Sequence, residues 1–98
     1  MTLTKGQEDL VRNILCEVFG IEPVEVYLFG SRVDGTATRA SDLDILLRGS
    51  QPIALKTMAL LREKFEDSVL PFRVDLVDDR TLSPEFRTRI MACSRRLV

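Results

Sequence analysis

Three aspartates stand in stretches of sequence that otherwise have the apolar character of buried β-strands. Asp42 and Asp44 open one apolar run, Asp75 lies within a later one, and Gly30-Ser31 ends an earlier one, ten residues before the aspartate pair. A buried carboxylate without a partner is so unfavourable that proteins neutralise it, pair it or bind it to a metal ion. Together with the Gly-Ser turn, the three aspartates indicate a site for a divalent metal ion and a nucleotide.

The geometry of a strand places the first two carboxylates together. Side chains alternate along a strand, so Asp42 and Asp44 point to the same face, about 7 Å apart along the strand. The opposite face of this run is apolar and carries Leu43, Ile45 and Leu47. Because Mg²⁺ prefers oxygen ligands and keeps waters and substrate phosphates in its shell, the spacing suits carboxylates that hold a magnesium pair from one side.

The third carboxylate repeats this pattern. Asp75 interrupts a run whose other face is formed by Phe72, Val74 and Leu76. It can join the aspartate pair if the two strands are neighbours, and the sequence leaves that adjacency open. An Asp-x-Asp triplet alone favours a solvated strand end. The order of apolar runs, Gly-Ser turn and acidic positions favours the metal and nucleotide site instead.

Composition excludes several other kinds of site. The 98 residues are expected to form one domain spanning 1–98, and the net charge of −1 gives no indication of nucleic-acid or membrane binding. The sequence has no histidine, which excludes a Ser-His-Asp triad and histidine-ligated zinc within it. No stretch resembles a membrane span or a signal-peptide core, so a cytoplasmic location is expected, with Cys16 and Cys93 reduced.

Helical and strand patterns alternate along the chain. A capping box at Thr4 and Gln7 opens the first helical pattern, and Gly20 suits its end. The order predicts an α/β (α+β) fold with a small mixed β-sheet flanked by helices, in which the second and third strands are parallel. The expected helices span residues 4–19, 52–67 and 83–95, and the expected strands span residues 24–29, 42–47 and 70–77.

The segment from residue 28 to 46, LFGSRVDGTATRASDLDIL, resembles the signature of the DNA polymerase beta-like nucleotidyltransferase superfamily. Within that superfamily the chain is similar to the minimal nucleotidyltransferases (MNT), whose fuller pattern is also met by Arg32, Gly35 and Ser41. The strand around Asp75 resembles the third-carboxylate strand of the family. The resemblance covers residues 8 to 90 approximately, and it implies a nucleotidyltransferase fold.

The resemblance also implies a role for each site residue. Gly30 and Ser31 would hold the triphosphate of a nucleotide, in keeping with the close backbone approach that glycine permits. Asp42, Asp44 and Asp75 would be the catalytic residues and would ligate two Mg²⁺ ions. The implied reaction is an in-line attack of a hydroxyl on the α-phosphate of a nucleoside triphosphate, expected to be ATP, with release of pyrophosphate.

Two loop arginines have a less definite role. Arg32 and Arg39 could neutralise phosphate charge, or they could be solvated residues of the loop. The segment from residue 81 to 98 contains four arginines and one acidic residue, which fits a solvated helix face or a docking surface.

Acceptor recognition is expected to need a second protein surface. Larger relatives carry helical domains for the acceptor, whereas MNT proteins of this size commonly pair with a helical HEPN-type toxin. The resemblance therefore implies an antitoxin that transfers AMP onto its partner. The alternatives are a non-catalytic partner-binding module and a nucleotidyltransferase subunit acting on a small molecule such as an aminoglycoside. A homo-oligomer that builds the cleft between copies is a further possibility.

Overall fold

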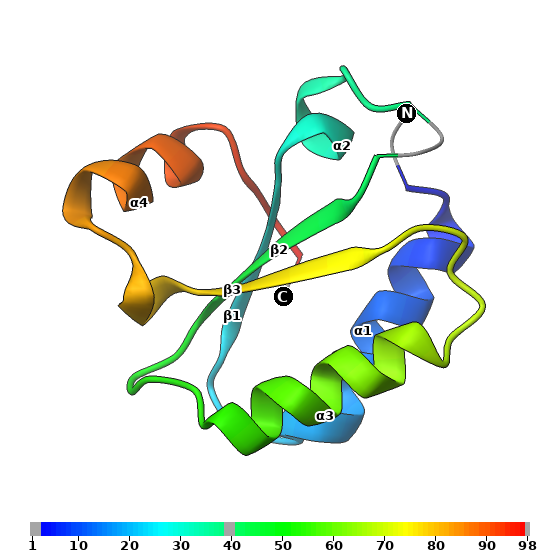
Figure 1. Ribbon diagram of the computed structural model, residues 1–98, viewed down its shortest axis with the longest axis horizontal. Helices are drawn as coiled ribbons and strands as arrows, with labels where there is room; N and C mark the ends of the chain where they lie inside the picture. Colours follow the sequence, from blue (N-terminus) through cyan, green and yellow to red (C-terminus); the bar gives the residue numbers. More distant parts are fainter. Residues whose placement is uncertain (1–2, 39–40, 98) are drawn as a thin grey trace.

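The computed structural model describes residues 3–38 and 41–97, which form a mixed β-sheet with helices on both faces (Figure 1). The sheet order is β3-β2-β1-β4, with β2 parallel to β3 and β1 antiparallel to both β2 and β4. The helices are α1 (Lys5–Phe19), α2 (Ser31–Asp34), α3 (Leu55–Glu66) and α4 (Pro84–Ala92), with a 3-10 turn, η1, at Asp79–Thr81. The strands are β1 (Glu25–Phe29), β2 (Leu43–Arg48), β3 (Val74–Asp78) and β4 (Arg95–Arg96). The predicted fold class is confirmed.

Local signals set the ends of the first helix. The hydroxyl of Thr4 accepts a hydrogen bond from the backbone N–H of Gln7 at 3.1 Å, and the Gln7 side chain accepts one from the Thr4 N–H at 2.9 Å. This reciprocal pair is the predicted capping box. The helix ends at Phe19 and is capped by Gly20, whose φ of 60° favours glycine because it has no Cβ.

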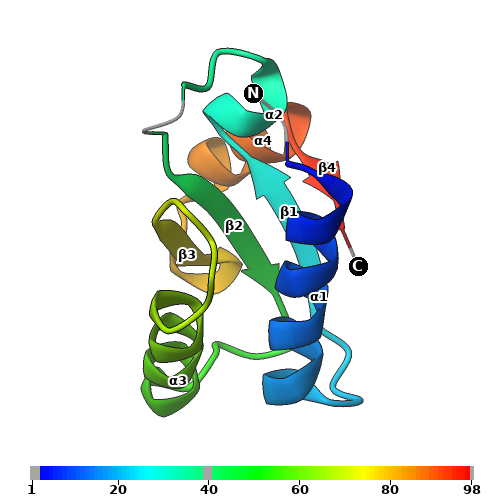
Figure 2. The same cartoon turned by 90° about the vertical axis from the view of Figure 1, so that its right-hand side faces the viewer.

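One face of the sheet carries the main core. Helices α1 and α3 lie side by side along this face, as Figure 2 shows. The alternation predicted for the second strand is confirmed, because Leu43, Ile45 and Leu47 all point into this core and are fully buried. Burial of a large aliphatic side chain stabilises a fold by about 1.5–3 kcal/mol, so these three residues fix which face of β2 is turned inward.

Helix α4 lies on the opposite face and covers only part of it. Ile90 packs there against Tyr27 and Leu46 in a small second cluster. The helical pattern of residues 83–95 predicts that Phe86, Ile90 and Met91 face inward. Ile90 and Met91 do so, but Phe86 is 49% exposed, so the prediction is wrong for Phe86. The part of this face beside the start of β2 and β3 is where the strand carboxylates lie.

The fourth strand is a correction to the sequence prediction. The last helix was expected to run to about Arg95, but it ends at Ala92, and Arg95–Arg96 pairs with β1. The backbone N–H of Leu97 donates to the Val26 carbonyl at 2.8 Å, and the Leu97 side chain is buried in the main core. Leu97 lies beyond the end of α4, and its burial in the core holds this segment at the edge of the sheet.

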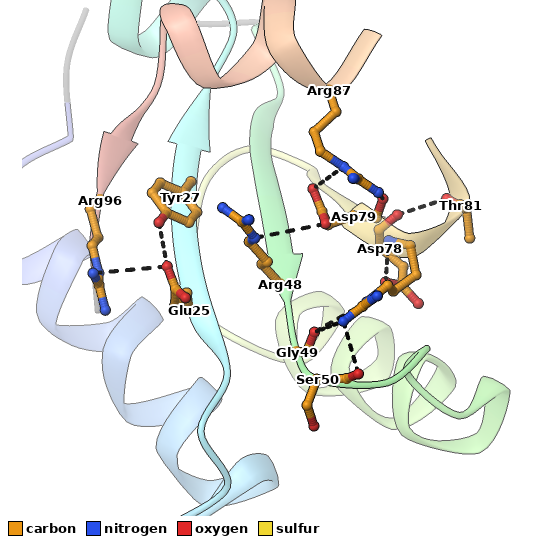
Figure 3. Close-up of polar contacts among 11 residues, drawn as sticks. Glu25, Tyr27, Arg48, Gly49, Ser50, Asp78, Asp79, Thr81, Arg87 and Arg96 are labelled. Carbon is orange, nitrogen blue, oxygen red and sulfur yellow. Dashed lines mark hydrogen bonds and ion pairs between the residues drawn. The ribbon is translucent and has the colours of Figure 1, made fainter. Parts of the chain in front are cut away.

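A group of charged side chains ties α4 to the sheet (Figure 3). The Asp79 side chain is only 4% exposed, and its Oδ1 lies 3.0 Å from Nε of Arg87 on α4. These two atoms form an ion pair without hydrogen-bond geometry, while Nη2 of Arg87 donates to the Asp79 carbonyl at 3.0 Å. Arg48 adds a longer contact to Asp79, at 3.9 Å.

No helix in the described ranges, 3–38 and 41–97, is long and apolar enough to cross a membrane. Cys16 and Cys93 are free thiols, as expected from their separation in the sequence.

Loss of the α4 anchor is expected to destabilise the protein. Arg87→Met leaves the buried Asp79 carboxylate with the distant Arg48 as its remaining cation, and we expect a loss of about 2 kcal/mol in the free energy of unfolding. This is less than for a fully buried pair, because the Arg87 side chain is 35% exposed. Urea denaturation measures the change. Adding Asp79→Asn should restore part of the loss, and Arg89→Met on the same helix should have little effect. Equal losses for Arg87→Met and Arg89→Met would contradict this role.

Candidate functional site

The end of β1 and the starts of β2 and β3 meet at one edge of the sheet, near α2 (Figure 1). In the register of the sheet, Asp44 lies opposite Phe29 on one side and opposite Asp75 on the other. The adjacency that the sequence left open is therefore present, because β2 and β3 are direct neighbours. Neighbouring strands lie about 4.8 Å apart, so Asp44 and Asp75 are side by side.

Both carboxylates face away from the main core. Leu46 and Val77, two residues further along the same strands, belong to the cluster beneath α4, and side chains at i and i+2 share a face. Asp44 is half-buried, whereas Asp42 and Asp75 are exposed. The three side chains thus lie on the solvent-facing part of the sheet surface that α4 does not cover.

Burial raises the pKa of the Asp44 carboxyl, and the negative charges of Asp75 and Asp42 raise this pKa further. The cluster therefore carries mutual repulsion among its members. Within residues 3–38 and 41–97, no lysine or arginine forms an ion pair with any of the three carboxylates. A polyvalent cation would relieve this repulsion, so the donor set fits a divalent metal ion.

The carboxylates do not form a complete cage. Among the described residues, no group of three acidic, cysteine or histidine side chains is arranged closely enough to hold a metal ion by itself. Mg²⁺ commonly binds one or two carboxylates and fills its remaining positions with waters and substrate phosphates. The arrangement thus fits a metal bound together with a nucleotide rather than a preformed structural metal site.

Gly30 lies directly against the Asp44 carboxylate. A Cβ atom at position 30 would be 2.1 Å from Asp44 Oδ2, and the φ of Gly30 is +80°. Both the space and the backbone conformation therefore favour glycine. The result is a stretch of bare backbone beside a candidate metal ligand, where a phosphate group could approach closely.

The loop after Gly30 returns the chain to the start of β2. Ser31 begins the single turn of α2, and its carbonyl accepts a hydrogen bond from the Ala37 N–H at 3.1 Å. Further along, the Thr38 N–H donates to the Ser41 hydroxyl at 2.9 Å. Ser31 and Asp42 are thus brought to the same edge of the sheet. The roles of Gly30, Ser31 and the aspartates in binding stay predictions.

One of the two suggestions for Arg32, a solvated loop residue, is wrong. Arg32 is 6% exposed, so it is not a solvated loop residue. Its Nε and Nη2 donate to the Ser41 carbonyl at 3.1 and 2.8 Å, and its guanidinium lies 4.0 Å from the ring centroid of Phe72. The sequence did not predict the contacts of Arg32 with Ser41 and Phe72, because no local pattern indicates contacts between such distant segments. Arg39 lies outside the described residues, and phosphate binding by either arginine stays a prediction.

The chain matches the family model of the nucleotidyltransferase domain over residues 8–97. It is 40% identical over 78 residues to a Haemophilus influenzae protein named "Probable protein adenylyltransferase MntA", covering 80% of this chain and 67% of that protein. A crystal structure of a toxin–antitoxin complex with AMP-PNP contains a chain that is 29% identical, with a TM-score of 0.76, covering 93% of this chain and 72% of the other. A protein provisionally described as a minimal nucleotidyltransferase is 30% identical, with a TM-score of 0.71 and coverage of 93% and 89%.

The contact of Gly30 with Asp44 predicts an unequal response of two glycines. Gly30→Ala should destabilise the fold by about 2 kcal/mol or more, since a positive φ and a steric clash act together. Gly35→Ala is the matched control, because Gly35 has a φ of +88° but, among the described residues beyond its chain neighbours, no heavy atom lies within 4 Å of where its Cβ would be. Gly35→Ala should lose only the stability that the unfavourable backbone conformation costs. Thermal unfolding of both variants measures the difference, and equal losses would contradict a tight contact at position 30.

The raised pKa of Asp44 predicts how stability depends on pH without metal. The folded state keeps the Asp44 proton to a higher pH than the unfolded chain, whose aspartates have a pKa of about 3.9. Stability is therefore lost as the pH rises through the raised pKa. Asp44→Asn should be more stable than the wild type at pH 7 in EDTA, and this advantage should vanish near pH 3. Urea denaturation at both pH values is the measurement, with the exposed Asp67→Asn as control. A variant less stable than the wild type at pH 7 would contradict the repulsion.

Proposed function

Because this chain belongs to the nucleotidyltransferase domain family, and within it to the minimal nucleotidyltransferases, we propose that it transfers AMP from ATP to a hydroxyl group of a partner protein. The observation that carries the proposal is the side-by-side placement of Asp44 and Asp75 next to the bare backbone of Gly30. An acidic pair that binds a cation and a backbone that admits phosphate are the two parts that nucleotidyl transfer needs.

Asp42, Asp44 and Asp75 are the residues that would hold two Mg²⁺ ions. Bound Mg²⁺ would lower the pKa of the attacking hydroxyl and neutralise negative charge on the phosphates and the leaving group. Gly30 would let the triphosphate approach the backbone, and the Ser31 hydroxyl would orient it. The acceptor oxygen forms a bond to the α-phosphorus, the bond from that phosphorus to pyrophosphate breaks, and the hydroxyl proton passes to a carboxylate of the cluster.

The proposed acceptor belongs to a helical, HEPN-type toxin, for which this chain would be the antitoxin. The supporting observations are the similarity to a protein named as a protein adenylyltransferase and to a chain crystallised as a toxin–antitoxin complex with AMP-PNP. Such a role would place the protein in the cytoplasm, where ATP is available. The partly open sheet face beside α4 leaves the carboxylates accessible to an acceptor side chain.

The direct test is incubation with labelled ATP, Mg²⁺ and the protein encoded by the neighbouring gene, followed by mass spectrometry of both proteins. We expect an AMP adduct on the partner. Asp44→Asn and Asp75→Asn should each lower the transfer rate by about 10²- to 10³-fold, the scale seen when one electrostatic stabiliser is removed from an active site. Both variants should stay folded by circular dichroism.

Two outcomes would replace the proposal. Tight partner binding without any adduct, unchanged in Asp44→Asn, would indicate a non-catalytic binding module. Modification of a small-molecule acceptor by the isolated chain, with the partner protein left unmodified, would indicate a small-molecule nucleotidyltransferase. Mg²⁺-dependent thermal stabilisation by ATP, lost in Asp44→Asn, is expected under transfer and not under partner binding alone.

A further inference from the structure

We infer that Arg32 is a positioning residue that fixes the metal-binding end of β2 through contacts with Ser41 and Phe72. We call these three residues the Arg32 clamp. The inference rests on the proposed function, because the residues that it positions are the proposed ligands. It differs from phosphate binding by Arg32, in which the guanidinium itself would touch the nucleotide.

The clamp joins the three segments that carry the site. Arg32 follows Ser31 on α2, Ser41 directly precedes Asp42, and Phe72 lies just before β3. A single side chain therefore links the proposed phosphate-binding turn to the starts of both acidic strands. These segments are distant in the sequence, so their relative placement depends on contacts of this kind.

The contacts suit arginine in particular. Two N–H groups of the guanidinium converge on one carbonyl oxygen, at 3.1 and 2.8 Å, while Cζ of the same group lies over the Phe72 ring, 4.0 Å from its centroid. A planar fork makes both contacts at once, whereas the compact ammonium of lysine cannot. Arg32 is also 6% exposed, so its charge depends on these partners in place of water.

A backbone hydrogen bond completes the arrangement on the side of β3. The Leu43 N–H donates to the Arg73 carbonyl at 2.8 Å. Leu43 directly follows Asp42 in the sequence, and Arg73 directly follows Phe72. The clamp holds Ser41 and Phe72, which come just before the two bonded residues in the sequence. Release of the clamp would therefore free the first residues of both strands and loosen the spacing between Asp42 and Asp75.

Arg32→Lys and Phe72→Leu, alone and combined, test the clamp. Each single variant should raise the hydrogen-exchange rate of the Leu43 amide by about tenfold or more. Each should also lower kcat by about 10- to 100-fold, as loss of groups that orient metal ligands does, and raise the Mg²⁺ concentration needed for half-maximal rate. The double variant should be no worse than Arg32→Lys alone, because both changes open the same contact.

The matched controls are Arg12→Lys and Ile21→Leu, which alter an exposed arginine of α1 and an exposed apolar residue just after it; α1 covers the sheet face opposite the carboxylates. They should leave exchange at Leu43 and the rate unchanged. A rise in KM for ATP with unchanged kcat and unchanged Leu43 exchange would overturn the inference and indicate direct phosphate binding. Additive losses in the double variant would overturn it as well. If Arg32→Lys does not fold, Phe72→Leu carries the same readouts.

Failure of the proposed function gives a different result from failure of the clamp. A wild-type protein that transfers no nucleotide to any acceptor, yet shows faster Leu43 exchange in both single variants, would disprove the function and support the clamp. Unchanged Leu43 exchange in both variants would disprove the clamp whether or not the wild type transfers nucleotide.

Discussion

The parallel pairing of β2 with β3 is the constraint on which the candidate site depends, because it puts Asp44 directly opposite Asp75. The two carboxylates repel each other, and the half-buried position of Asp44 limits how well water can screen that repulsion. Nothing in the pair itself holds it together. The opposite faces of the same strands supply the attraction, since Leu43, Ile45 and Leu76 are buried against α1 and α3. Apolar packing on one side of the sheet thus maintains an unfavourable charge arrangement on the other.

The second sheet face has one half covered by α4 and one half that carries the carboxylates. Helix α4 covers the half that contains Tyr27 and Leu46, where Ile90 packs, and leaves the acidic half exposed. The helix is fastened at two points: Arg87 pairs with the buried Asp79, and Leu97 reaches the main core through β4. These two contacts hold α4 on the half of the face that does not carry the carboxylates. They also explain why so short a helix, with Ile90 as its buried residue, keeps a fixed place on the sheet.

The elements that could be predicted from the sequence are those fixed by local chemistry. The capping box gave the start of α1, and strict alternation gave the inward face of β2. What could not be predicted depends on contacts between distant segments. Strand β4 is two residues long, and it forms because the Leu97 side chain is buried in the core. No local pattern in the sequence indicates that burial. The candidate carboxylates stood out because charge in an apolar run is rare, whereas the buried setting of Arg32 depends on the path of the whole loop.

The contact between Gly30 and Asp44 makes the two positions depend on each other for any change of sequence. A side chain at position 30 would need the carboxylate at 44 to withdraw, because its Cβ would lie 2.1 Å from Asp44 Oδ2. Position 30 therefore cannot accept a side chain without strain while the aspartate at 44 stays in place. A variant with a side chain at position 30 would have to change the acid at 44 as well, and the variant changed at position 30 alone would be less stable than the one changed at both positions.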